Sequence, residues 1–345
     1  MTMLIRACGL ALALFAMAGA GTALAQGSSS NAQAQQERRD TQPLNNAPVW
    51  REVRSGNHGY TSQQGNERGV LVQSGGETWR EIRNGPATVY GGWLLILVFL
   101  AIAAFYSVKG AIKLREKASG RRIVRFNAVE RVTHWTVAIS FVVMAVSGLT
   151  MLFGKHILLP IIGYTLFAWL TLILKNLHNF VGPLFILGLV AMIVLYLKDN
   201  LPRLADLNWF ARAGGLFTGA HVPSGKFNGG EKGWFWVGVV ALGVIISVSG
   251  MVLLFPNFEQ TRAMMQQAWI WHAGAALVLM AISLGHIYLG TIGMEGAYEA
   301  MRKGTVDEAW AREHHELWYH EMKSGGHGAS GGAVPSGAPH KEERP

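Results

Sequence analysis

The chain has 345 residues, of which 50% are hydrophobic and only 15% are charged, and its formal net charge is +9. Soluble domains carry about 25% charged residues, so this composition excludes a disordered chain and an ordinary soluble domain. A single cysteine excludes a disulfide-stabilised scaffold. The basic residues lie between long apolar runs, which is typical of a membrane protein whose charge sets its orientation.

Residues 1–25 have the pattern of a secretory signal peptide. Arg6 precedes an apolar stretch, and the segment ends in Ala-Leu-Ala at 23–25, which is typical of a cleavage site. The apolar stretch is shorter than the about 20 residues that a membrane span needs, so we expect cleavage rather than an uncleaved anchor. Cys8 would be removed with this segment, which would leave the mature chain without thiol chemistry or c-type haem attachment.

Residues 26–88 are expected to form a small periplasmic N-terminal region. Its beginning is rich in Gln, Ser and Asn, which indicates a linker. The sequence Trp-Arg-Glu-Val-Arg-Ser-Gly at 50–56 recurs as Trp-Arg-Glu-Ile-Arg-Asn-Gly at 79–85. Residues 69–73 favour a strand, so we expect short strands or hairpins and a docking role for residues 46–88.

Five apolar runs are long enough to cross about 30 Å of hydrocarbon at about 1.5 Å per residue. They cover residues 90–108, 134–153, 176–197, 234–255 and 268–292. A sixth run, 157–174, contains Pro160 and Gly163. We expect an interfacial or re-entrant segment there, and a sixth span is the less favoured alternative.

The predicted fold is an all-α integral membrane protein in the inner membrane of a bacterium. Its parts are an extra N-terminal transmembrane helix (89–108), a basic cytoplasmic loop (109–132), a four-helix transmembrane domain (133–293) and a cytoplasmic C-terminal tail (294–345). Lys and Arg residues crowd the loops after the first, third and fifth spans. By the positive-inside rule the C-terminus is cytoplasmic and the N-terminus is periplasmic.

Four histidines lie within the predicted spans, where other ionisable residues are nearly absent: His134, His178, His272 and His286. Ionisable residues inside spans are costly and are therefore functional candidates. His272 and His286 are 14 positions apart, so they share one helix face and are separated by about 21 Å. The topology puts His134 and His286 at the cytoplasmic depth, and His178 and His272 at the periplasmic depth.

Two histidine pairs at two depths are what two bis-histidine b-type haems require. The alternative is that these histidines are packing residues with hydrogen-bond partners. The sequence Val-Ser-Gly at 146–148 recurs as 248–250 with the same three residues, and its glycines favour either room for a flat macrocycle or close helix packing. The histidines outside the spans, His315 among them, are expected to be solvated or in loops.

Residues 225–232, Gly-Lys-Phe-Asn-Gly-Gly-Glu-Lys, lead into the fourth span at the cytoplasmic depth. A glycine such as Gly230 permits close approach of a ligand, and Asn228 and Glu231 are able to hydrogen-bond it or move protons. We therefore expect a quinone site in this loop, and a simple helix-entry turn is the alternative.

An ordered set of motifs resembles the cytochrome b (gamma) subunit of membrane-bound respiratory formate dehydrogenase. The motifs are Arg-Val-Thr-His-Trp-Thr at 131–136, Leu-His-Asn-Phe-Val-Gly at 177–182, Lys-Phe-Asn-Gly-Gly-Glu-Lys at 226–232, His-Ala-Gly at 272–274, His-Ile-Tyr at 286–288 and Trp-Ala-Arg-Glu-His-His-Glu-Leu-Trp-Tyr at 310–319. The resemblance covers about residues 125–322. It implies that His178 and His272 ligate a periplasmic haem and that His134 and His286 ligate a cytoplasmic haem.

The resemblance also implies a function for the chain. It would be a membrane-anchoring, di-haem b electron-transfer subunit that reduces a quinone, ubiquinone or menaquinone, near His286 and Asn228. Its implied partners are an iron–sulfur beta subunit and a molybdenum- or tungsten-containing alpha subunit that oxidises formate. The alternatives are the cytochrome b partner of a nickel–iron hydrogenase or thiosulfate reductase, and a non-redox membrane anchor.

Overall fold

The computed structural model describes residues 74–215 and 222–325, together with residues 37, 50–51 and 54–55. The expected signal peptide and the strand expected at 69–73 lie outside the described residues. Nearly all of the described residues belong to one compact unit that includes the chain from Gly75 onward. The architecture given below is that of this unit.

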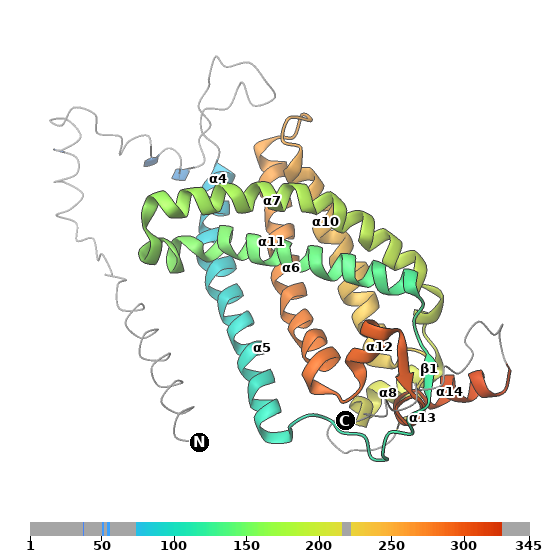
Figure 1. The fold of residues 1–345 in the computed structure, drawn as a ribbon. Helices are drawn as coiled ribbons and strands as arrows, with labels where there is room; N and C mark the ends of the chain where they lie inside the picture. The colour runs from blue at the N-terminus through green and yellow to red at the C-terminus, as the bar shows by residue number, and fades with distance from the viewer. Residues whose placement is uncertain (1–36, 38–49, 52–53, 56–73, 216–221, 326–345) are drawn as a thin grey trace, which may run out of the picture. The chain divides into compact units, whose positions relative to one another are not determined.

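Five helices in the described part of the chain are long and apolar enough to cross a membrane, as the sequence predicts. They run over Gly75–Lys109, Ala128–Ile157, Leu159–Tyr196, Gly229–Leu254 and Arg262–Gly293. Figure 1 shows α6 (Ala128–Ile157) and α7 (Leu159–Tyr196) as an antiparallel pair that crosses α10 (Gly243–Leu254) and α11 (Arg262–Tyr288) obliquely. The first span, α5 (Thr88–Lys109), runs beside α11.

The segment before the first span is helical, which corrects the expectation of short strands in the described part of residues 46–88. The segment consists of α4 (Ser74–Ile82) and the π-helix η1 (Arg83–Ala87), which continue into α5. The ring of Trp79 packs edge-on against Trp269 of α11, with ring centres 5.6 Å apart, and the guanidinium of Arg83 lies over both rings. Trp79 and Arg83 are one helical turn apart, so this packing favours a helix.

The sixth apolar run belongs to the first half of α7, so it is continuous with the third span and does not form a separate sixth span. Pro160 lies in the first turn, where its missing N–H costs no hydrogen bond. Gly163 has a φ of 74° and a ψ of 171°, so it interrupts the helix and separates this first turn from the rest of α7. The uninterrupted part of α7, from Tyr164 to Tyr196, is about 50 Å long, and His178 lies near its middle rather than at its start.

The fourth and fifth spans change helix type along their length. The fourth begins with α9 (Gly229–Gly233) and the nine-residue π-helix η4 (Trp234–Leu242) and ends with α10. The fifth ends in the π-helix η5 (Leu289–Gly293) after α11. π-Helical turns are rare and are frequent at functional sites.

The polar ends of the spans carry a folded cluster that the sequence-based domain boundaries missed. Its members, here called the polar cluster, are β1 (Arg122–Val124), α12 (Ala297–Lys303), β2 (Thr305–Asp307), α13 (Glu308–His314) and α14 (Glu316–Lys323). β1 and β2 pair antiparallel, with Ile123 opposite Val306. Trp310 is buried at the centre of the cluster. The basic loop and part of the tail thus fold together.

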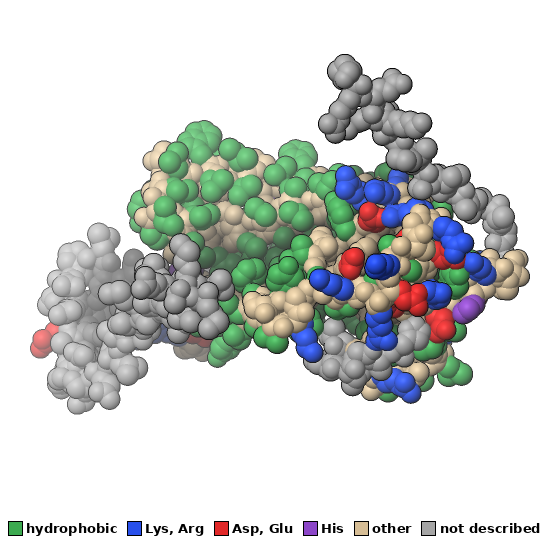
Figure 2. Space-filling model, turned by 60° about the horizontal axis from the view of Figure 1, so that its bottom comes forward, with side chains coloured by type: hydrophobic (Ala, Val, Ile, Leu, Met, Phe, Trp, Pro, Cys, Tyr) green, Lys and Arg blue, Asp and Glu red, His purple; other side chains and the backbone are tan. Residues whose placement is uncertain are grey.

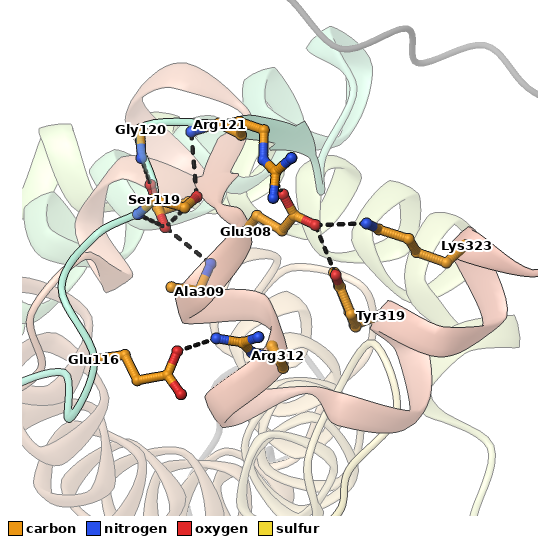
Figure 3. A network of polar contacts seen from close by, with 10 residues as sticks. Glu116, Ser119, Gly120, Arg121, Glu308, Ala309, Arg312, Tyr319 and Lys323 are labelled. Carbon is orange, nitrogen blue, oxygen red and sulfur yellow. Dashed lines mark hydrogen bonds and ion pairs between the residues drawn. The ribbon is translucent and has the colours of Figure 1, made fainter.

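Ion pairs around Glu308 connect α13 to α14 and to Arg121, the residue just before β1 (Figure 3). The Glu308 carboxylate lies 2.6 Å from Nε of Arg121 and 2.8 Å from Nζ of Lys323, and it accepts a 2.6 Å hydrogen bond from the hydroxyl of Tyr319. The hydrogen bonds from Lys323 and Tyr319 lower the pKa of Glu308 to about 2. Figure 2 shows such charged side chains gathered over this end of the unit, whereas hydrophobic side chains cover the long helices.

Candidate functional site

The structure brings the four intramembrane histidines together as two pairs. The ring centres of His134 on α6 and His286 on α11 are 6.2 Å apart. Those of His178 on α7 and His272 on α11 are 6.1 Å apart. Both pairs share α11, along which the two histidines are separated by about 21 Å. These are the pairings that the predicted depths indicate.

The spacing within each pair fits two imidazoles on opposite sides of one iron atom. An imidazole nitrogen binds a metal at about 2 Å and lies about 1 Å from its ring centre, so two such ring centres stand about 6 Å apart. Among the described residues, no group of three or more His, Cys, Asp or Glu side chains could hold a bare metal ion. A haem needs only the two axial protein ligands, because its macrocycle supplies the others.

Hydroxyl and carbonyl groups fix the rings of His178 and His272. Nδ1 of His178 lies 2.8 Å from Oγ of Ser147, which itself donates to a backbone carbonyl of α6, so the imidazole is the donor. Nδ1 of His272 lies 3.0 Å from the carbonyl of Ile246 and 3.3 Å from Oγ of Ser249. Metal-ligating histidines usually donate their second N–H in this way, which leaves the other nitrogen for the metal.

The two Val-Ser-Gly repeats therefore hold one histidine each, a role that sequence reasoning missed. A Cβ added at Gly148 would lie 3.6 Å from Cε1 of His178. A Cβ added at Gly250 would lie 3.1 Å from Cε1 of His272. In this structure both glycines face imidazole rings; the approach is tight at Gly250 and an ordinary van der Waals contact at Gly148.

The other histidine pair has a different environment. The indole of Trp234 stacks on His286, with ring centres 4.8 Å apart and an interplanar angle of 12°. Trp135 packs edge-on against His134. Nδ1 of His134 is buried without a hydrogen-bond partner among the described residues. A buried polar atom without a hydrogen-bond partner is costly, so the environment of His134 fits an imidazole ring that binds a further ligand.

Asn228 and Glu231 form the capping box of α9. Oδ1 of Asn228 accepts from the N–H of Glu231 at 2.9 Å, and Oε2 of Glu231 accepts from the N–H of Asn228 at 2.8 Å. Oε1 of Glu231 accepts a 3.0 Å hydrogen bond from Arg125. The loop is thus a helix-entry turn in its hydrogen bonding. It adjoins the second histidine pair, because α9 leads directly to Trp234 and Glu231 interacts electrostatically with His286.

The glycines of this loop adjoin an indole. A Cβ added at Gly230 would lie 2.5 Å from Cη2 of Trp209, and one at Gly229 would lie 2.9 Å from its Cε3. Trp209 belongs to α8 (Leu204–Ala211). The space that the sequence analysis assigned to a ligand beside Gly230 is therefore filled by Trp209.

His315 is buried, which corrects its assignment to the solvated histidines. Only 1% of the residue is exposed, and its Nδ1 donates to the carbonyl of Gly225 at 2.8 Å. Its Nε2 lies 4.0 Å from Oε2 of Glu231. Burial and the charge of Arg125 lower the pKa of His315 to about 3, so the ring is neutral near pH 7. His315 thereby holds the loop against the polar cluster.

The family model described as prokaryotic cytochrome b561 matches residues 125–304. The chain belongs to this family. A curated relative, the formate dehydrogenase cytochrome b556(fdo) subunit of Escherichia coli K12, is 33% identical over 205 residues, which are 58% of this chain and 93% of that protein. The nitrate-inducible formate dehydrogenase cytochrome b556(Fdn) subunit of the same strain is 28% identical over 217 residues, 60% of this chain and 94% of the relative. The formate dehydrogenase cytochrome b556 subunit of Haemophilus influenzae is also 28% identical over 217 residues, 60% of this chain and 86% of the relative.

These comparisons confirm the resemblance that the motifs indicate. The chain is a membrane cytochrome b with an electron-transfer role, and haem b is the cofactor that the family implies. Its relatives are subunits of formate dehydrogenase complexes, which implies further subunits. The matched residues begin at Arg125, so α4 and α5 lie outside the family model.

Proposed function

We propose that this protein is the membrane-anchoring, di-haem b subunit of a formate dehydrogenase. Its role is to pass electrons from an iron–sulfur subunit through two haems to a membrane quinone. The observation that carries the proposal is the presence of two histidine pairs with ring centres 6.1 and 6.2 Å apart on three apolar helices. Haem b bound between such imidazoles accepts and donates one electron at a time.

The side chains of this chain have distinct tasks in the proposal. His178 and His272 are the ligands of the periplasmic haem, and His134 and His286 are those of the cytoplasmic haem. The hydrogen bond to Ser147 keeps the proton of His178 on Nδ1, so Nε2 is available to the iron.

We further propose that the protein lies in a bacterial inner membrane, with its N-terminal region periplasmic after signal-peptide cleavage and its C-terminus cytoplasmic. The density of Lys and Arg at the polar-cluster end supports this orientation. The partners are an iron–sulfur beta subunit and a molybdenum- or tungsten-containing alpha subunit that oxidises formate. Formate oxidation itself belongs to the alpha subunit.

The proposed quinone site is the loop that contains Asn228, Gly230 and Glu231, and the quinone is ubiquinone or menaquinone. The support is the position of this loop beside the cytoplasmic histidine pair: Trp234, whose ring stacks on His286, directly follows α9. A lipid-soluble acceptor bound there would be near the cytoplasmic haem and near the carboxylate of Glu231.

The haem content of the purified complex tests the ligand assignment. We expect two haem b per chain, and we expect His272→Ala and His178→Ala to lose the same haem while His134→Ala loses the other. His156→Ala, at an exposed histidine on α6, is the matched control and should keep both haems. Retention of both haems in His272→Ala would contradict the assignment.

Electron-donor assays of the same preparations test the proposed partner. The wild-type complex should reduce viologen with formate, and the His272→Ala complex should keep this activity but lose formate-to-quinone transfer. Viologen reduction with hydrogen instead of formate would favour a hydrogenase partner.

A pair of matched substitutions tests the quinone site. Asn127 forms the same capping box with Glu130 at the start of α6, with hydrogen bonds of 2.9 and 2.7 Å. Asp caps helices as well as Asn does, so Asn127→Asp and Asn228→Asp should both preserve their helices. We expect Asn228→Asp to raise the quinone KM about tenfold, equivalent to about 1.4 kcal/mol, and Asn127→Asp to leave it unchanged. Equal KM values would assign Asn228 to capping alone.

A further inference from the structure

The helix α8 has its apolar side chains on the outside and its acid on the inside. Leu204, Leu207 and Phe210 are 86%, 68% and 55% exposed, whereas Asp206 is buried. A helix on the surface of a soluble domain has the opposite arrangement, with its apolar stripe facing the core and its charges facing water. The arrangement in α8 therefore indicates a non-aqueous environment on its outer side.

Contacts on the inner side fix the rotation of α8 about its own axis. Oδ2 of Asp206 lies 2.8 Å from Nζ of Lys232, and both side chains are buried. Trp209, also on the inner side, fills the space beside Gly229 and Gly230. A buried ion pair whose partner is removed is strongly destabilising, so the inner face stays fixed to α9. The side chains of Leu204 and Leu207 consequently remain on the outer face of α8.

The chain places α8 at the end of two spans. It follows α7 after the short 3₁₀ turn η2 (Lys198–Asn200), and Trp236, near the start of the fourth span, donates a 2.9 Å hydrogen bond to the carbonyl of Asn200. Both neighbouring spans thus end near α8, and the ends of membrane spans are expected at the level of the lipid headgroups. Lys198 and Arg212 are exposed on either side of the helix, as in helices that bind anionic lipid surfaces.

We propose that α8 is an interfacial helix that lies in the plane of the membrane on the polar-cluster side, with its leucine face inserted among the lipids of that leaflet. Leu204, Leu207 and Phe210 are the inserted side chains. This inference does not depend on the number of haems or on the quinone. It adds that Trp209 connects α8 at the membrane surface to the loop of residues 228–231, because its ring lies against Gly229 and Gly230.

Spin labels on single cysteines in the full complex test the proposal. The complex, with Cys8→Ser as background, is placed in nanodiscs of phosphatidylcholine and phosphatidylglycerol and labelled at Leu204→Cys or Leu207→Cys. The lipid reference is Leu187→Cys, an exposed position within α7, and the water reference is Ser324→Cys, an exposed position after α14. Collision rates with oxygen and with a water-soluble nickel chelate give the depth of each label.

We expect both α8 labels to collide more with oxygen than with the nickel chelate, with ratios between those of the two references. Nickel accessibility equal to that of Ser324→Cys would place α8 in water and overturn the proposal. Low collision rates with both reagents would show that a protein surface, from a second copy or a partner subunit, covers the leucines, and this result would overturn it too. Two independent label positions guard against a local disturbance at either one.

Discussion

Ser147 and Ser140 are two buried serines of α6 that differ in one contact. Each hydroxyl donates to backbone carbonyls at 2.7 and 3.1 Å, but Ser147 also accepts the hydrogen bond from His178. That bond makes the imidazole more basic and favours oxidised iron. We therefore expect Ser147→Ala to raise the midpoint potential of the haem ligated by His178, and Ser140→Ala to leave it unchanged.

The size of this change follows from the strength of one hydrogen bond. A bond of about 0.5–1.5 kcal/mol corresponds to about 20–60 mV for a one-electron couple. Redox titration followed by absorption spectroscopy measures both variants. Identical potentials in Ser147→Ala and Ser140→Ala would show that the bond to His178 has no electronic effect.

His315 makes the stability of the polar cluster dependent on pH. Its folded pKa of about 3 lies below the ordinary value of 6.5, so the unfolded segment binds a proton that the folded one does not. Its contribution to stability is therefore complete above about pH 6.5 and decreases by up to about 1.4 kcal/mol per pH unit as the pH falls towards 3. His315→Asn keeps a donor for the carbonyl of Gly225 and should flatten this dependence between pH 7 and 5. Hydrogen-exchange protection of α13, corrected for intrinsic rates, would show the change, and an unaltered slope would assign it to other groups.

At the scale of elements, Gly304 connects α12 to β2 in a conformation that few other residues adopt. Its φ is 80°, and a Cβ there would lie 2.5 Å from the carbonyl oxygen of Phe126. Gly120 has a similar φ of 76° with no atom within 4 Å of an added Cβ, so it is the matched control. Alanine at either position destabilises the fold by the left-handed penalty of about 1–2 kcal/mol. We expect Gly304→Ala to destabilise it by about 1–3 kcal/mol more, because the backbone at Phe126 must move away from the new Cβ. Hydrogen exchange of β1 amides would report both changes, and equal effects would mean that the contact with Phe126 relaxes without cost.

The elements also show where sequence reasoning succeeds and where it ends. Length and hydropathy predicted the five spans because each apolar run must cover the same hydrocarbon thickness. The start of α7 was missed because Pro160 and Gly163 indicate the end of a helix. Proline suits the first turn, and Gly163 does leave helical geometry, but the helix resumes at once in the same apolar segment. β1 and β2 are three-residue strands far apart in the sequence, and such short segments carry no periodicity that predicts their pairing.

At the candidate site, too, part of the arrangement could be predicted from the sequence and part could not. Helical rise and span order predicted which histidines share a level, so the two pairings were predictable from the sequence. The partners of their rings were not, because the hydroxyl of Ser147 reaches His178 only through the tertiary packing of α6 on α7. The space beside Gly230 is filled by Trp209 for the same reason, since a glycine in a loop does not specify which neighbour uses its missing side chain.

The whole molecule is asymmetric in charge along the direction of its spans. Opposite the polar cluster, Lys155 lies in the last turn of α6 and Arg262 begins α11, while Lys175 lies within α7. The segments after the first, third and fifth spans contain many more basic residues. Basic residues near the ends of spans are retained in the cytoplasm, so the polar cluster should be cytoplasmic. Asn257→Cys, between α10 and α11, and Ser324→Cys lie in exposed positions at the two ends. In a Cys8→Ser background, a membrane-impermeant maleimide should label Asn257→Cys in spheroplasts and Ser324→Cys only in inverted vesicles.

This orientation decides which compartment each histidine pair faces. The loop between α10 and α11 is near the His272 end of α11, and the polar cluster follows the His286 end. Labelling in the opposite order would move His178 and His272 to the cytoplasmic depth and place the Asn228 loop on the periplasmic side. Electrons would then have to enter at the other pair, and quinone protons would come from the periplasm. The maleimide experiment thus tests the proposed direction of electron flow across the membrane independently of haem content.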